Sequence, residues 1–83
     1  MELATYKDMI YCRIKELIAE KERAENRSIT YRTITAETGL SSTTLVKLAS
    51  HSGINRIDAS TIDVLCDYFS CGVGDLLIRI PNN

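Results

Sequence analysis

The sequence predicts a small all-α domain of five helices, and three observations support this class. The chain has 83 residues, which is enough to bury one hydrophobic core. It contains four Gly and one Pro, and none of them precedes Gly39. Leu, Ile, Glu, Lys and Arg recur throughout, and these residues favour helices when breakers are few. With no internal repeat or linker, we expect a single domain over residues 1–83.

The first helix is expected from about Thr5 to Glu25. Its apolar residues recur at helical spacing, and Lys21 can lay its stem along the edge of that face. The residues that define the face are Ile10, Ile14, Leu17 and Ile18. Residues 23–28 hold no aliphatic side chain larger than that of Ala24 and are typical of a connection.

Two short helices separated by a tight turn follow. Thr30 is expected to cap a helix over residues 31–38, and Gly39 to end it in the left-handed conformation. Ser41 is then expected to cap a third helix from Ser42 to about Ser50. Leu45 and Leu48 would face the core.

A fourth and a fifth helix are expected in the C-terminal part. Asp58 is expected to cap the fourth, whose buried face is predicted to hold Ala59, Ile62, Leu65, Cys66 and Phe69. A short last helix is expected to start near Val73, with Asp75 in its first turn, where a negative charge suits the helix dipole. Residues 78–81 fit either a helical or an extended end.

Composition argues against membrane, metal and secreted classes. The sequence shows no long apolar span and no signal peptide, so we expect a soluble, cytoplasmic protein. Cys12, Cys66 and Cys71 are odd in number and lack metal-binding spacing, which indicates small hydrophobes in a reducing compartment. No metal or cofactor is expected.

An enzyme is not expected. The single histidine, His51, has no Ser or Cys partner at a recognisable spacing, and no carboxylate pair stands out. The stretch "CGVGD" lacks the lysine and the glycine spacing of a phosphate-binding loop. These residues therefore indicate no catalytic site.

Charge is unevenly distributed along the chain. The net charge is −1, which argues against strong nonspecific binding to nucleic acid. Residues 23–56, however, hold five basic and two acidic residues, whereas residues 57–83 hold one basic and four acidic residues. The middle of the chain is thus the part suited to an anionic partner.

The stretch "TYRTITAETGLSSTTLV" resembles the Cro/repressor-type helix-turn-helix pattern. Thr30, Gly39, Ser41 and Thr44 match that pattern identically, and Ile34, Leu40 and Leu45 match conservatively. The following "NRIDASTIDVLCDYFSCGVGDLLIRIP" is similar to the last two helices of a small single-domain branch of the family. The resemblance runs from about Met9 to Pro81. It implies a five-helix lambda-repressor-like domain, with the helix-turn-helix at about residues 30–50.

The resemblance also implies a function. A sequence-specific regulator of this type, expected to be a repressor, binds double-stranded DNA with a recognition helix, here about residues 42–50, in the major groove. The exposed positions of that helix, the expected base contacts, are Ser42, Thr43, Val46 and Lys47. Expected phosphate contacts are Thr30, Tyr31, Arg32, Ser50, Asn55 and Arg56.

Several residues allow a second interpretation. Tyr31 stands where the family usually has Gln, and it can either reach a phosphate or pack against the first helix. Arg27 can support DNA binding or remain solvated. Thr35 replaces a usual Ala and needs a hydrogen bond, and Thr44 is expected to bond locally. The connection before Thr30 is several residues longer than usual.

The partners expected are double-stranded DNA and a second copy of the chain. A homodimer follows from the family and from an apolar tail, namely Leu76, Leu77, Ile78 and Ile80. No membrane and no small-molecule effector is expected. The alternative is a protein-interaction or antitoxin-like module that uses the same fold without binding specific DNA, and the net acidic charge favours it.

Overall fold

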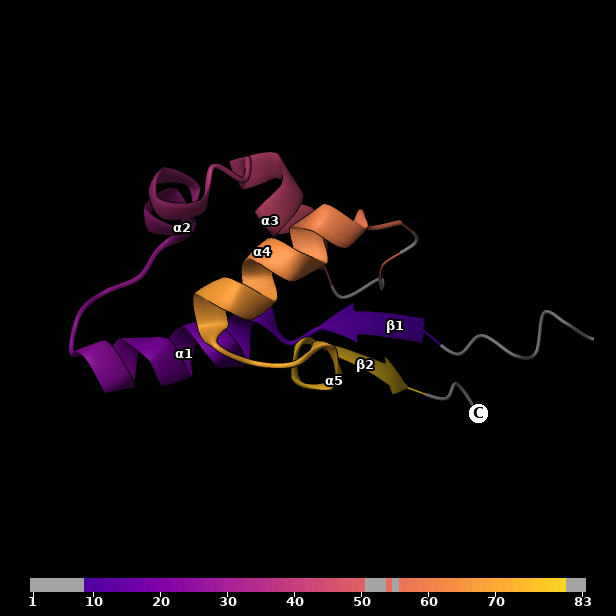
Figure 1. Cartoon of the computed structure of the whole chain (residues 1–83), viewed down its shortest axis with the longest axis horizontal. Coiled ribbons are helices and arrows are strands. Elements are labelled where there is room, and N and C mark those ends of the chain that lie inside the picture. The colour runs from indigo at the N-terminus through magenta and orange to yellow at the C-terminus, as the bar shows by residue number, and fades with distance from the viewer. Residues whose placement is uncertain (1–8, 51–53, 55, 81–83) are drawn as a thin grey trace, which may run out of the picture.

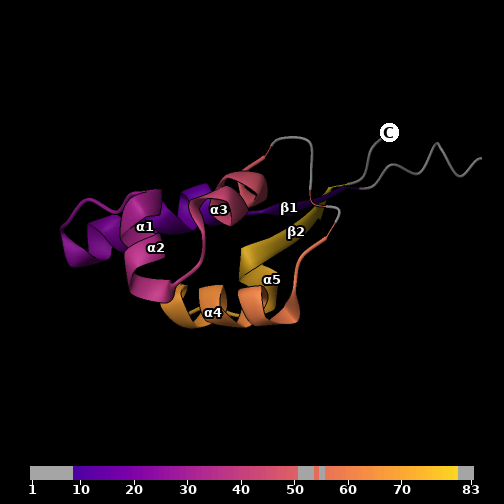
Figure 2. The ribbon, with the colours of Figure 1, turned by 90° about the horizontal axis from the view of Figure 1, so that it is seen from above.

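The computed structural model describes residues 9–50, 54 and 56–80, and helices dominate this part of the chain (Figure 1). The elements in order are β1 (Met9–Cys12), α1 (Ile14–Glu25), α2 (Tyr31–Thr38), α3 (Ser42–Leu48), α4 (Ala59–Phe69), α5 (Val73–Leu76) and β2 (Leu77–Ile80). Figure 1 shows α1 and the two strands along one side and α2 and α3 along the other. Figure 2, turned by 90°, shows α4 along the lower edge, below α1, α2 and α3. Within the described ranges the expectation of five helices is confirmed.

The all-α expectation is wrong for the two ends of the domain. β1 and β2 form a two-stranded antiparallel sheet in which Met9 pairs with Ile80 and Tyr11 with Ile78. Both strands are only four residues long and, apart from Arg79, mainly apolar, and for such short segments periodicity does not separate helix from strand. Their β-branched and aromatic side chains fit a pleated surface, and long-range pairing then decides the structure.

The first helix therefore starts later than expected. α1 begins at Ile14 rather than Thr5, and residues 5–8 lie outside the described part. Ile10, expected in the core face of that helix, lies in β1 and is 37% exposed. The ends of the sheet are tied to the helices, because the Arg13 amide donates to the Leu76 carbonyl at 2.7 Å.

The core collects side chains from all five helices and from the connection after α1. Leu45 and Leu48 of α3 are buried as expected, and Leu76, expected in an apolar tail, is buried as well. Ala59 was expected to be buried but is exposed at the start of α4. The buried residues are Ile14, Leu17, Ile29, Ile34, Leu45, Leu48, Leu65 and Leu76.

Candidate nucleic-acid interface

α2 begins with a reciprocal pair of hydrogen bonds. The Thr30 hydroxyl accepts from the Thr33 amide at 3.2 Å, and the Thr33 hydroxyl accepts from the Thr30 amide at 3.2 Å. This capping box satisfies amides that the first turn of a helix leaves without partners. The expected cap at Thr30 and the expected range of α2 are both confirmed.

The turn between α2 and α3 depends on a glycine. Gly39 has φ of 85°, and its amide donates to the Thr35 carbonyl at 2.9 Å. A side chain at this φ is strained, so glycine is the residue that ends the helix here at least cost. Thr38 adds a second stop, because its hydroxyl donates to the Ile34 carbonyl and accepts from the Leu40 amide.

Two of the four consecutive hydroxyl residues of α3 and its cap bond to each other. The Ser41 hydroxyl accepts from the Thr44 amide at 3.1 Å, and the two hydroxyls lie 2.9 Å apart. Ser41 is thus the N-cap, and Thr44 bonds locally, as expected. The Ser42 hydroxyl lies 3.4 Å from that of Thr35, so Thr35 finds its hydrogen bond at the turn.

α3 has one buried face and one exposed face. Leu45 and Leu48 turn into the core, while the expected base contacts lie on the surface. The helix ends at Leu48 with Ala49 as its C-cap, slightly before the expected end near Ser50. The four exposed side chains that share this surface are Ser42, Thr43, Val46 and Lys47.

The expected phosphate contacts lie on both sides of α3 in the sequence. Thr30, Arg32 and Arg56 are exposed, whereas Tyr31 is half-buried and packs against the core. Tyr31 thus packs against the core, which includes Ile14 and Leu17 of α1, and its contact with a phosphate stays a prediction. Ser50, two residues after the end of α3, is half-buried, and Asn55 and His51 lie outside the described residues.

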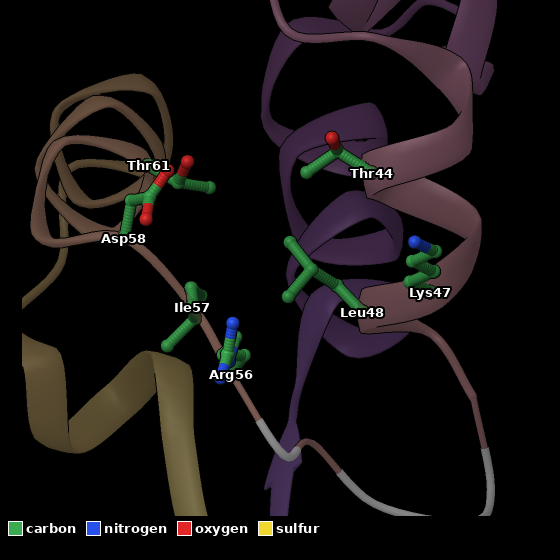
Figure 3. Close-up of a pocket in the computed structure, with 7 residues that line it drawn as sticks. All are labelled: Thr44, Lys47, Leu48, Arg56, Ile57, Asp58 and Thr61. Atoms are coloured by element: carbon green, nitrogen blue, oxygen red, sulfur yellow. The ribbon is translucent and has the colours of Figure 1, made fainter.

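A cavity of about 240 Å³ separates α3 from the start of α4. Lys47 from α3 and Arg56 from the segment before α4 lie on its two sides (Figure 3). Asp58 and Thr61 complete the α4 side, and neither was expected there from the sequence. Asp58 occupies the N-cap position of α4 but makes no side-chain cap hydrogen bond, contrary to the expectation. Sequence spacing could not reveal this cavity, because it forms only where α3 packs beside the start of α4.

Arg27 is paired with acids. Its guanidinium donates two hydrogen bonds to Glu37, at 2.8 and 3.0 Å, and one to Glu25 at 2.7 Å. Arg27 therefore adds little to the basic surface that the charge distribution indicated. The exposed basic residues of the middle segment that remain for an anionic partner are Arg23, Arg32, Lys47 and Arg56.

The described cysteines show no sign of a metal site. Cys12, Cys66 and Cys71 are free and half-buried against the core, and burial raises the pKa of the Cys12 thiol to about 11. Across residues 9–50, 54 and 56–80, no group of His, Cys, Asp and Glu is arranged to hold a metal ion. In the same ranges, no helix combines the length and apolar character needed to cross a bilayer.

Comparison with known proteins assigns the family. The model of the Cro/C1-type HTH DNA-binding domain matches residues 13–82, which is most of the chain. No curated protein and no solved structure matches the chain. The matched range includes all five helices, the turn at Gly39 and β2. The chain therefore belongs to the Cro/C1-type helix-turn-helix family of DNA-binding domains.

Proposed function

We propose that this protein is a small transcriptional regulator that represses genes by binding specific duplex DNA, with α3 in the major groove. One observation carries the proposal. α3 presents Thr43, Val46 and Lys47 to solvent, while Leu45 and Leu48 anchor its other face in the core. Caps at Thr30 and Ser41 and the turn at Gly39 fix this exposed face on the domain.

The exposed side chains of α3 match groups in the major groove. The hydroxyls of Ser42 and Thr43 can bond base edges, and Val46, 57% exposed, can contact a thymine methyl group. Lys47 can donate to the O6 and N7 acceptors of guanine. Because no arginine, asparagine or glutamine lies on this face, base contacts alone give modest affinity.

Phosphate contacts would supply the rest of the affinity. Arg32 near the start of α2 and Arg56 in the segment after α3 are both exposed and therefore accessible to an anionic partner. Arg56 and Lys47 line the same cavity beside α3, where the carboxylate of Asp58 offsets part of their positive charge. The proposed contacts are Thr30, Tyr31, Arg32, Ser50, Asn55 and Arg56.

The proposal includes a homodimer that reads two half-sites. Within the apolar tail, Leu76 is fully buried in its own core and cannot serve a partner. Ile78 and Ile80, 37% and 45% exposed, are the tail residues that remain for contact with a second copy.

Fluorescence anisotropy tests the proposal with two kinds of DNA, random duplexes and a duplex selected for binding to the wild-type protein. We expect binding to weaken with salt, with log K falling by about 0.9 per log salt for each neutralised phosphate. The triple variant Ser42→Ala, Thr43→Ala, Lys47→Ala should lose the preference for the selected duplex. Lys15→Ala, which removes an exposed lysine of α1, is the matched charge control.

Two results would contradict it. If no duplex is bound even at low salt, the regulator proposal is wrong and the protein-interaction module becomes the better account. If the triple variant keeps the preference for the selected duplex, α3 is not the recognition helix.

A further inference from the structure

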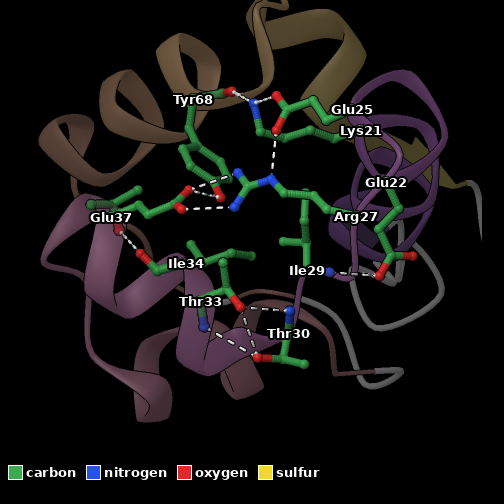
Figure 4. A network of polar contacts seen from close by, with 11 residues as sticks. Lys21, Glu22, Glu25, Arg27, Ile29, Thr30, Thr33, Ile34, Glu37 and Tyr68 are labelled. Carbon is green, nitrogen blue, oxygen red and sulfur yellow. Dashed lines mark hydrogen bonds and ion pairs between the residues drawn. The ribbon is translucent and has the colours of Figure 1, made fainter.

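A closed ring of polar contacts joins α2 to the rest of the domain (Figure 4). Lys21 of α1 pairs with Glu25 at 2.7 Å, and Glu25 accepts from Arg27 in the connection at 2.7 Å. Arg27 binds Glu37 of α2 through two hydrogen bonds, and the Tyr68 hydroxyl of α4 donates to the same carboxylate at 2.7 Å. Lys21 then donates to the Tyr68 carbonyl at 3.0 Å, which completes the ring.

The connection that carries Arg27 is itself fixed to α1. The side chain of Ile29 is buried in the core, and its amide donates to the Glu22 carboxylate at 2.7 Å. The Arg27 amide donates to the Glu22 carbonyl at 3.2 Å, and Asn26 adopts the left-handed conformation that ends α1. These contacts with α1 fix the backbone around Arg27 and so help to place its guanidinium beside Glu37.

α2 is anchored in the core through few side chains. Ile34 is its one fully buried residue, and the half-buried Tyr31 in its first turn packs against the core as well. Glu37 provides an anchor near the other end of the helix, two residues before the turn at Gly39. The orientation of α2 sets both the position of Arg32 at its start and the direction in which the chain enters α3.

We propose that Arg27 is a positioning residue for DNA binding: through Glu37 it holds α2 in the orientation that lets the helix-turn-helix bind the duplex. This inference rests on the proposed function. An isolated exposed ion pair contributes little, but a two-pronged Arg–carboxylate contact within a network of charges is the exception. In this role Arg27 does not touch DNA, and its charge is matched by Glu25 and Glu37.

Two substitutions give results that distinguish positioning from simple charge effects. Glu37→Gln removes a negative charge, which by electrostatics alone should strengthen DNA binding. Arg27→Lys keeps the charge but loses the planar fork. If Arg27 acts by positioning, both variants weaken binding to a duplex selected with the wild type, by about three- to fivefold. The matched control is Glu16→Gln, an exposed carboxylate of α1 outside the ring.

The salt dependence of binding supplies the second readout. Arg27→Gln should weaken binding without changing the slope of log K against log salt, whereas loss of a phosphate contact lowers that slope by about 0.9. Tyr68→Phe, which removes one hydroxyl from the ring, should weaken binding in the same direction. If circular dichroism shows that the Arg27 and Glu37 variants are unfolded, DNA binding by Tyr68→Phe decides whether the ring positions α2.

The outcomes separate the two proposals. Wild-type protein that binds no duplex overturns the proposed function and this inference with it. Wild-type protein that binds, together with a Glu37→Gln variant that binds as well or more tightly, overturns the inference alone. A reduced salt slope for Arg27→Gln also overturns it, because Arg27 would then contact a phosphate.

Discussion

The hydroxyl of Thr35 lies 3.4 Å from the hydroxyl of Ser42, across the turn that joins α2 to α3. The contact joins the two helices of the motif through side chains, beside the backbone turn at Gly39. A small apolar residue in place of Thr35 could not make it. The start of α3 is thus held from the α2 side at Ser42, one of the residues proposed to contact base edges.

The first prediction concerns this contact. Thr35→Val keeps the side-chain volume but removes the hydroxyl, so Ser42 loses a partner while the packing stays similar. Because the contact is exposed and long, we expect the free energy of unfolding to fall by at most about 0.5 kcal/mol, the low end for one hydrogen bond. Specific DNA binding should weaken as well. Urea unfolding and anisotropy measure the two effects, and unchanged specific binding would show that the contact does not position Ser42.

A side chain at Gly39 should cost stability because of the backbone conformation there. No atom lies within 4 Å of a Cβ built there, but φ is 85°. Gly39→Ala should therefore lower the free energy of unfolding by about 1–2 kcal/mol through left-handed strain. Gly74→Ala is the control, since its Cβ also meets open space and its φ is not positive. Equal stabilities of the two variants would contradict the argument.

Substitutions at two adjacent positions of α3 should have different effects, one mainly on stability and the other mainly on DNA binding. Leu45 is fully buried, and Leu45→Ala should cost about 2–5 kcal/mol of unfolding free energy. Val46 is 57% exposed, and Val46→Ala should change stability by at most about 0.5 kcal/mol while weakening specific DNA binding. Thermal unfolding and anisotropy on both variants check this. Equal losses of stability would mean that α3 presents a different face.

Arg56 should contribute through a phosphate. Arg56→Gln should weaken binding to random and selected duplexes alike and lower the salt slope by about 0.9. Lys15→Gln removes a positive charge from the exposed side of α1 and should leave the slope unchanged. A slope unaffected by Arg56→Gln would remove this residue from the interface.

Acid should weaken the fold partly through Glu37. The Arg27 guanidinium and the Tyr68 hydroxyl lower the pKa of Glu37 from 4.5 to about 2. Above pH 4.5 the carboxylate is charged in both states and its stabilisation is complete. As the pH falls toward 2, the unfolded chain takes up the proton first and stability is lost. The melting temperature of wild type should therefore fall more steeply over this range than that of Glu37→Gln. Melting temperatures that fall in parallel with pH for wild type and Glu37→Gln would contradict this role of Glu37.

The helix-turn-helix could be predicted from the sequence because its signals are local. Thr30, Gly39 and Ser41 determine the caps and the turn within a few residues of themselves, and the structure has them in those roles. Leu45 and Leu48 follow from helical spacing. Five helices in this order were expected from the residue pattern and from the family resemblance, and the described part of the chain has all five.

Contacts between distant segments could not be predicted in the same way. The pairing of Met9–Cys12 with Leu77–Ile80 depends on tertiary structure, and such short, mainly apolar segments fit helix and strand alike. The partner of Arg27 was equally hidden, since Glu37 lies ten residues away on another element. The longer connection was visible in the sequence, but its attachment through Ile29 and Glu22 was not.

The most direct test of the central claim, that α3 reads duplex DNA, is an NMR titration of isotope-labelled protein with a selected duplex. The account predicts that the largest amide shifts fall on residues 42–47, with smaller shifts near Arg32 and Arg56. Ala substitution at Thr43 and Lys47 should reduce these shifts at equal DNA concentration. Shifts confined to β1, β2 or the α4–α5 turn, with α3 unperturbed, would contradict the account.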